Sequence, residues 1–169
     1  MKKNIRKVAM ASVLAALICV ATMVIKVPTP PIGYVNLGDC VVLLAGWLLP
    51  PGYGFLAAGI GSGLADVLLG YGIYAPVTFV IKGLMAIACY FLRKGLKGRI
   101  KKELPVLIIA GLVAEVIMVS GYYIFEGFMY GWSASLVNVP FNAVQGAVGL
   151  VAGAAISSQL LKIKGLQSN

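Results

Sequence analysis

The chain has 169 residues, of which 60% are hydrophobic and only 11% are charged, and its mean hydropathy is +0.96. A soluble domain of this size carries about 25% charged residues, so the composition excludes a soluble globular domain and predicts an integral membrane protein. The formal net charge of +9 would suit nucleic-acid binding, but the basic residues form short clusters between apolar runs, which is typical of membrane topology.

Six apolar segments are candidates for membrane-spanning helices, since about 20 helical residues cross the hydrocarbon layer. We predict an all-α integral membrane protein that forms one transmembrane domain over residues 1–169, with helices at about 8–27, 36–49, 52–70, 76–93, 104–126 and 136–161. The first segment follows a basic stretch, as in a signal peptide, but it is too long for such an apolar core and predicts a retained helix. The second is short and is expected to be tilted, partly unwound or supported by its neighbours.

Proline marks the expected start of four helices, at Pro51, Pro76, Pro105 and Pro140. Proline costs little in a first turn, because its missing N–H would have been unpaired there. The prolines therefore support these boundaries independently of hydropathy.

The lysine and arginine residues predict the orientation. Basic clusters precede the first helix, separate the fourth from the fifth, and follow the sixth. With six spans these clusters all lie on one side, and the positive-inside rule places that side, with both termini, in the cytoplasm.

Polar side chains within the expected helices are costly unless paired, so each is a candidate functional residue. Asn138, Asn142 and Gln145 are spaced i, i+4, i+7 and share one helical face. Glu115 and Tyr122 are seven positions apart and also share a face. The polar residues gather in the outer half of the membrane, whereas the cytoplasmic half is nearly free of them. This pattern favours an outward-facing pocket for a small polar or aromatic ligand over a channel or proton relay, which needs polar residues through its full depth.

Each of these residues also has a structural alternative. Lys82 can extend to the outer headgroups or pair with Glu115 as a structural bridge. Asp39 and Asp66 can be helix-end residues in an interface, and Asn138 can cap the sixth helix.

Small residues at four-residue spacing recur in three of the segments. In the third and sixth helices we interpret the glycines as intramolecular packing positions. In the first helix Ala11 and Ala15 have this spacing, with Ser12 and Ala16 offset by one. The alternative there is the docking of a partner subunit.

Four stretches together resemble the substrate-binding S components of energy-coupling factor (ECF) vitamin transporters. They are ASVLAAL in the first helix, GYVNLGD at the entrance to the second, GIGSGLADVLLGY in the third and APVTFVIKG in the fourth. The resemblance is strong from Ala11 to Gly83 and continues in the layout of the remaining chain. It is closest to the branch assigned to hydroxymethylpyrimidine or vitamin B6 compounds, while related sequences are labelled as riboflavin transporters.

The resemblance implies a six-helix subunit of the prokaryotic plasma membrane that binds its vitamin from outside with high affinity. It implies association with a transmembrane coupling protein, contacted through Ala11 and Ala15, and with two cytoplasmic ATPases. It also implies that the subunit topples in the membrane to release its ligand inside. The sequence has no P-loop of the form GxxxxGK[ST], so ATP hydrolysis is assigned to the partners.

For such a ligand, Tyr74 and Trp132 in the outward loops would stack on a flat ring, unless they belong to an interfacial aromatic belt. Carboxamides and charged groups would orient the polar edge of the ring. The predicted substrate-binding set is Asn36, Asp39, Tyr74, Lys82, Glu115, Tyr122, Trp132, Asn138, Asn142 and Gln145. If the charged groups pair with one another, the carboxamides are firmer contacts than Glu115 and Lys82. Riboflavin, thiamine and pantothenate are alternative ligands.

An intramembrane enzyme is the contrasting function class, with Asp39, Asp66 and Glu115 as acid–base or metal groups. The chain has no histidine, no nucleophile–base pair and no clustered metal motif, and its three cysteines are widely spaced without a CxxC. We therefore expect no catalytic residues, no metal and no cofactor. A small channel or a purely structural membrane protein is disfavoured by the apolar cytoplasmic half.

Overall fold

The computed structural model describes residues 2–29 and 34–160, within which the chain forms six helices and a two-stranded hairpin. In chain order the elements are α1 (Lys2–Val24), β1 (Lys26–Pro28), β2 (Tyr34–Asn36), α2 (Gly38–Leu48), α3 (Pro51–Leu68), α4 (Ala75–Leu96), α5 (Glu103–Tyr130) and α6 (Trp132–Leu160). In the described part, α1, α4, α5 and α6 are long and apolar enough to cross a membrane. The predicted class, an all-helical integral membrane protein with six helices, is confirmed. Residues 30–33, in the loop between the first two predicted helices, and the predicted helix end at 161 lie outside the described residues.

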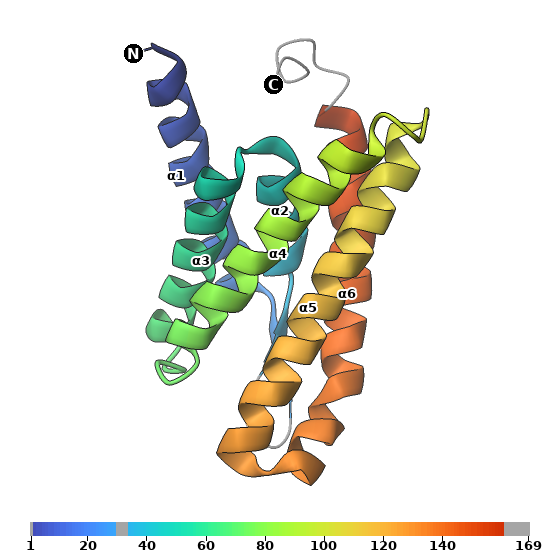
Figure 1. Cartoon of the computed structure of the whole chain (residues 1–169). Helices are drawn as coiled ribbons and strands as arrows, with labels where there is room; N and C mark the ends of the chain where they lie inside the picture. Colours follow the sequence, from blue (N-terminus) through green and yellow to red (C-terminus); the bar gives the residue numbers. More distant parts are fainter. Residues whose placement is uncertain (1, 30–33, 161–169) are drawn as a thin grey trace.

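The short helix α2 lies inside the bundle, packed against α1, α3, α4 and α6 (Figure 1). Its 11 residues span only about 16 Å at 1.5 Å per residue. Val42, Leu43 and Trp47 are fully buried and form the centre of the hydrophobic core. The helix therefore behaves as a core element supported by its neighbours, as expected for the second segment.

Three of the four prolines lie where the sequence places them. Pro51, Pro76 and Pro105 are in the first turns of α3, α4 and α5. The prediction for Pro140 is wrong, because α6 begins at Trp132 and contains Pro140 in its interior. The cause is a tight connection: Gly131, at a positive φ of 90°, joins α5 directly to α6. A conformation of this kind is easy for glycine and costly for other residues.

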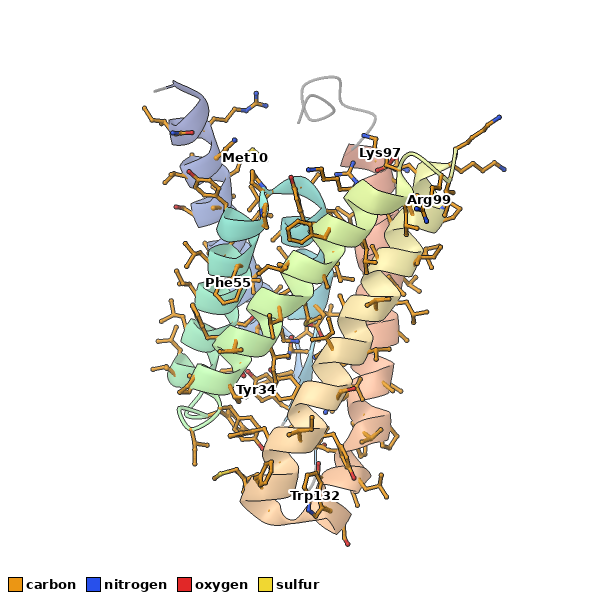
Figure 2. The ribbon with its side chains drawn as sticks, in the orientation of Figure 1. Met10, Tyr34, Phe55, Lys97, Arg99 and Trp132 are labelled. Atoms are coloured by element: carbon orange, nitrogen blue, oxygen red, sulfur yellow. The ribbon has the colours of Figure 1, made fainter. Side chains whose placement is uncertain are left out.

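The two ends of the bundle differ in chemistry. The start of α1, the α4–α5 connection and the described end of α6 lie together at one end, where Lys97 and Arg99 project (Figures 1 and 2). The α3–α4 turn and the α5–α6 turn, with Trp132, lie at the opposite end. The basic clusters within the described residues thus share one end of the molecule.

The hairpin was not expected from the sequence. β1 and β2 pair antiparallel, with Lys26 opposite Asn36 and Val27 opposite Val35. Three-residue strands are too short to show the alternating pattern that identifies a strand. The hairpin joins α1 to α2, and β2 packs against α1 and α6.

The small residues serve packing within the chain in α3 and α6, as predicted. A Cβ added to Gly59 would meet Phe79 of α4, and one added to Gly153 would meet Cys40 of α2. In α1, Ala11 and Ala15 are partly buried against the core, and Ala15 lies against Gly61 of α3. Ser12 and Ala16 are on the exposed side of α1.

Candidate functional site

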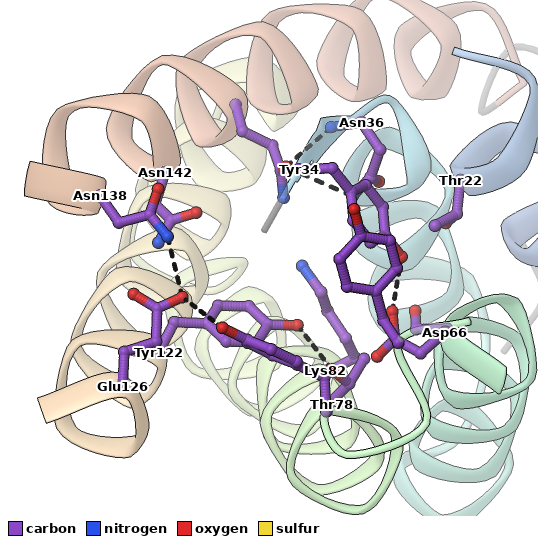
Figure 3. Close-up of a pocket in the computed structure, with 14 residues that line it drawn as sticks. Thr22, Tyr34, Asn36, Asp66, Thr78, Lys82, Tyr122, Glu126, Asn138 and Asn142 are labelled. Atoms are coloured by element: carbon purple, nitrogen blue, oxygen red, sulfur yellow. Dashed lines mark hydrogen bonds between the residues drawn. The ribbon is translucent and has the colours of Figure 1, made fainter. Parts of the chain in front are cut away.

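A polar cavity opens between the helices, on the side of the core away from the basic end. Its lining comes from α1, α3, α4, α5 and α6, from β2 and from the α3–α4 turn: Thr22, Tyr34, Asn36, Ser62, Asp66, Tyr71, Tyr74, Thr78, Lys82, Tyr122, Glu126, Asn138, Asn142 and Gln145 (Figure 3). The cavity volume is about 40 Å³, which is room for water molecules but well below the roughly 300 Å³ of a typical small-molecule pocket. A ring-sized ligand would therefore have to displace lining side chains.

The innermost wall is built on an ion pair between Lys82 of α4 and Asp39 of α2. Both side chains are almost completely buried. Gln145 of α6 donates through Nε2 to Asp39 Oδ2 at 2.6 Å and accepts from the Asn36 backbone N–H at 2.8 Å. Burying two charges is favourable only when their remaining hydrogen-bonding positions are also filled. Gln145 meets this condition for Asp39 and joins α2 to the hairpin.

Asn36 fixes the entrance to α2. Its side chain donates to Gln145 Oε1 at 3.3 Å and accepts from the Gly38 backbone N–H at 2.7 Å. The space beside Gly38 is filled by Thr22 and Asn36, so a side chain at this position would collide with both. Gly38 therefore allows β2, α1 and α2 to converge beside the cavity.

On the α3 side, Tyr34 of β2 donates to Asp66 Oδ1 at 2.5 Å. Burial, together with the neighbouring carboxylate, raises the pKa of the Tyr34 hydroxyl well above its ordinary value. The hydroxyl therefore keeps its proton and remains a donor. This bond ties the hairpin to the end of α3.

On the opposite side, Glu126 of α5 accepts hydrogen bonds through Oε1 from Asn138 Nδ2 at 2.9 Å and from the Tyr74 hydroxyl at 3.4 Å. Ser135 donates to the Tyr123 carbonyl at 2.7 Å and so fixes the start of α6 against α5. Asn138 lies well inside α6 and is not a helix cap, because the helix begins at Trp132.

Tyrosine rings form one wall between these two sides. Tyr71 lies 4.8 Å from Tyr34 and 6.4 Å from Tyr74, measured between ring centroids, and Tyr74 lies 6.5 Å from Tyr122. Tyr122 also shares a 3.0 Å hydrogen bond with Thr78. Aromatic rings with one polar end suit the binding of a flat ring that carries polar groups at its edge.

Several buried polar atoms of the lining have no hydrogen-bond partner within the described ranges. They are Ser62 Oγ, Asp66 Oδ2, Glu126 Oε2 and Asn138 Oδ1. Buried polar groups are nearly always paired in folded proteins, so an unpaired group needs an explanation. The described residues contain no cluster of three His, Cys, Asp or Glu side chains that could hold a metal ion.

A family model described as "ECF-type riboflavin transporter, S component" matches residues 2–162. The chain belongs to the family of ECF-type S components. These are substrate-binding transport subunits for vitamins that work with coupling and ATPase subunits, and they are not enzymes.

The chain is also similar to one further protein in sequence and to two solved structures in fold. A protein of Pyrococcus woesei, described as an uncharacterized protein in gap 3'region, is 32% identical over 148 residues, which cover 86% of this chain and 95% of that protein. The fold resembles the S component of a bacterial ECF transporter, with a TM-score of 0.74, 21% identity and coverage of 94% and 97% of the two chains. It also resembles the biotin S component of an ECF-type ABC transporter, with a TM-score of 0.63, 19% identity and coverage of 98% and 96%.

Most of the sequence-predicted residues of this S component come together at the cavity. The lining includes Asn36, Tyr74, Lys82, Tyr122, Asn138, Asn142 and Gln145. Asp39 does not line it but holds Lys82 in place. Two predicted residues lie outside the cavity. Trp132 is half-exposed and contacts Tyr123 and Phe128. Glu115 lines a separate, mainly apolar groove between α5 and α6. The alternative of a Lys82–Glu115 bridge is wrong, because the partner of Lys82 is Asp39.

The S component also lines its cavity with residues that the predicted set omits, namely Thr22, Tyr34, Ser62, Asp66, Tyr71, Thr78 and Glu126. Helical spacing offers a signal for three of them. Thr78 lies four positions before Lys82, Glu126 lies four positions after Tyr122, and Ser62 lies four positions before Asp66. Residues at this spacing share a helical face, so each follows from a polar neighbour.

Proposed function

We propose that the chain captures one small water-soluble vitamin or precursor from outside the cell membrane and delivers it inward as the substrate-specific subunit of an ECF-type ABC transporter. The observation that carries this proposal is the group of polar and tyrosine side chains that surround one cavity. These side chains come from five helices and from β2, so their convergence is a product of the fold and not of a single amphipathic helix.

The direction of binding follows from the distribution of charge. The cavity lies on the side of the core away from Lys97 and Arg99. The positive-inside rule assigns basic ends to the cytoplasm, so the cavity faces outward and both termini face inward. Between the Lys82–Asp39 pair and the basic end, α2 and α4 contribute apolar residues such as Leu43, Trp47 and Met85, all fully buried. This seal favours a binding subunit over a channel.

The ligand is proposed from two sources. The sequence resemblance favours a vitamin B6 compound or hydroxymethylpyrimidine, and the description of the matching family model favours riboflavin as the second candidate. Both classes present a flat ring with polar edges to the tyrosine wall. Thiamine and pantothenate are further alternatives.

The proposed assembly contains a transmembrane coupling protein and two cytoplasmic ATPases. ATP hydrolysis belongs to these partners, since the sequence contains no P-loop. The sequence resemblance assigns the contact with the coupling protein to Ala11 and Ala15. Because both are partly buried against the core, the proposed contact is extended to the exposed side of the same helix, at Ser12 and Ala16. Delivery by toppling would carry the cavity toward the inside.

Thermal unfolding of the purified chain in detergent tests the binding function. The panel is pyridoxine, pyridoxamine, hydroxymethylpyrimidine, riboflavin, thiamine and pantothenate. A ligand present at 100 times its Kd stabilises the folded state by about 2.7 kcal/mol, so one member should raise the melting temperature clearly. If no vitamin shifts the melting temperature, and none co-purifies with the protein, the proposed function is wrong.

A further inference from the structure

We propose that the ligand carries hydrogen-bond donors at two separated ends of a flat body and has no anionic group. This inference rests on the proposed vitamin-binding function and narrows its substrate class. It is drawn from the unpaired acceptors and from the balance of charge in the cavity.

The first position with unpaired hydrogen-bonding atoms is on the α3 side of the cavity. Asp66 uses Oδ1 to accept from Tyr34, while Oδ2 has no partner within the described ranges. Ser62 lies one turn earlier on the same helix, and its hydroxyl is also without a partner there. Both side chains are more than nine-tenths buried. A donor from the ligand would fill a position that no described protein group fills.

The second position is at the α5–α6 side, across the cavity (Figure 3). Glu126 Oε2 and Asn138 Oδ1 are buried and lack partners in the described part of the chain. The orientation of the Asn138 amide is determined by its neighbour, because its NH₂ group must face the Glu126 carboxylate that accepts from it. Its oxygen is therefore an acceptor left over for another group.

The charged side chains of the lining also favour a ligand without an anionic group. Among the described residues, Lys82 is the single cationic side chain that lines the cavity, and its charge is matched by Asp39 behind it. Its ammonium also lies 5.5 Å from the centroid of the Tyr122 ring. Within the described part of the chain Asp66 and Glu126 form no salt bridge, so the lining carries more acidic than basic side chains.

An anionic ligand could gain a cation only by taking Lys82 from Asp39. Asp39 has no exposed surface, and it would then keep only Gln145 as a partner. Leaving a buried carboxylate without its counter-charge is strongly unfavourable. The same ligand would also face the unpaired carboxylate oxygens of Asp66 and Glu126, to which it could offer no attraction. The geometry therefore selects neutral or cationic molecules with N–H or O–H groups.

Matched ligand pairs test this selection by titration calorimetry on the purified full chain. Each pair shares a ring and differs by one anionic group: pyridoxamine and its 5′-phosphate, hydroxymethylpyrimidine and its phosphate, and riboflavin and its 5′-phosphate. In the pair that binds, the non-anionic member should bind at least about 10-fold more tightly than the anionic member. A tighter anionic member, or tight binding of biotin or pantothenate, overturns the inference while the vitamin-binding function stands. If neither member of any pair binds and no other vitamin does, the proposed function itself fails, and the inference with it.

Two substitutions test the two ends with the ligand that binds. Asp66→Asn and Glu126→Gln each replace a charged acceptor by an amide of the same shape, and each should weaken binding by about 10- to 100-fold, the range for a hydrogen bond to a charged group. Glu103→Gln is the matched control, because it makes the same charge change in the Arg93 pair at the basic end, and it should leave affinity unchanged. If both cavity variants unfold at the wild-type temperature and bind as tightly as Glu103→Gln does, the assignment of the two ends is wrong.

Discussion

Lys82 of α4 is paired with Asp39 in the first turn of α2, and both side chains are almost completely buried. The pair joins two helices that are distant in sequence and forms the innermost wall of the cavity. Its position makes the ion pair a structural requirement of the site before any ligand arrives.

Asp39→Asn should therefore destabilise the protein strongly, because it leaves the Lys82 ammonium buried without its counter-charge. Removing one partner of a buried pair costs about 3–5 kcal/mol. Glu103→Gln breaks a partly exposed pair with Arg93 and should cost less than about 1 kcal/mol. Thermal unfolding of the two variants in the same detergent compares them directly. Equal melting temperatures would show that the buried pair is not a stabilising element.

Tyr34→Phe should loosen the hairpin from α3. The substitution removes the hydrogen bond that Asp66 Oδ1 accepts from the Tyr34 hydroxyl, while Asp66 Oδ2 already lacks a partner in the described part of the chain. A hydrogen bond to a charged group contributes about 1.5–3 kcal/mol, and amide hydrogen exchange at Val35 should speed up accordingly. Tyr71→Phe, which keeps its ring contact with Tyr34, is the control. Unchanged exchange in Tyr34→Phe would mean that other contacts hold the hairpin.

Glu115→Gln should leave ligand affinity within about threefold of wild type, in contrast to Glu126→Gln. Both carboxylate oxygens of Glu115 are buried and unpaired among the described residues, and the side chain lies in the α5–α6 groove and not in the cavity. Calorimetric titration of both variants with the same vitamin provides the measurement. A loss of affinity in Glu115→Gln as large as in Glu126→Gln would place Glu115 back in the binding site.

Gly146→Ala should destabilise the α5–α6 contact. A Cβ at this position would lie 2.9 Å from Glu115 Oε2 and 3.1 Å from its Cβ. Overpacking of this kind costs about 1–3 kcal/mol. The same substitution in a Glu115→Ala background should cost less, because the obstructing carboxyl is gone. Equal losses in the two backgrounds, measured by thermal unfolding, would show that α5 moves to admit the methyl group.

Two tryptophan substitutions on α1 separate internal packing from partner docking. Ala16 is exposed, whereas Ala15 lies against Gly61 of α3. Ala16→Trp should leave melting temperature and ligand binding unchanged but abolish uptake in cells that express the whole transporter. Ala15→Trp should lower the melting temperature of the isolated subunit. If Ala16→Trp supports normal uptake, the coupling protein docks on a different surface.

The sequence predicted the bundle and much of the cavity because a membrane imposes strict rules on both. Apolar runs of helical length must be helices, and polar residues among them must meet partners. Asn142 and Gln145 were found through this rule. The rule did not predict the position of Glu115. Glu115 shares a helical face with Tyr122, but it lies at a different depth along α5 and lines the α5–α6 groove. On α5 the cavity is lined by Tyr122 and Glu126. Glu115 lies two turns before Tyr122, toward the basic end of the bundle, and therefore outside the lining.

Other residues were missed because their helices run longer than hydropathy suggests. Glu126 falls at the predicted end of a helix that continues to Tyr130, and the sequence offered no sign that Gly131 would join two helices so tightly. Tyr34 and Tyr71 have the composition of an interfacial belt, and only the fold shows that they turn inward. These contacts depend on how segments distant in sequence approach, which local pattern does not contain.

The hydrogen bonds of Gln145 also bear on the stage of synthesis at which the cavity can be completed. Asp39 and Lys82 lie in segments that are synthesised early, but Gln145 lies in the last helix. A nascent chain that has not yet inserted α6 lacks both the third group of the ion-pair network and the anchor for the Asn36 amide. The network and the cavity lining are therefore complete only after α6 has packed against the other helices.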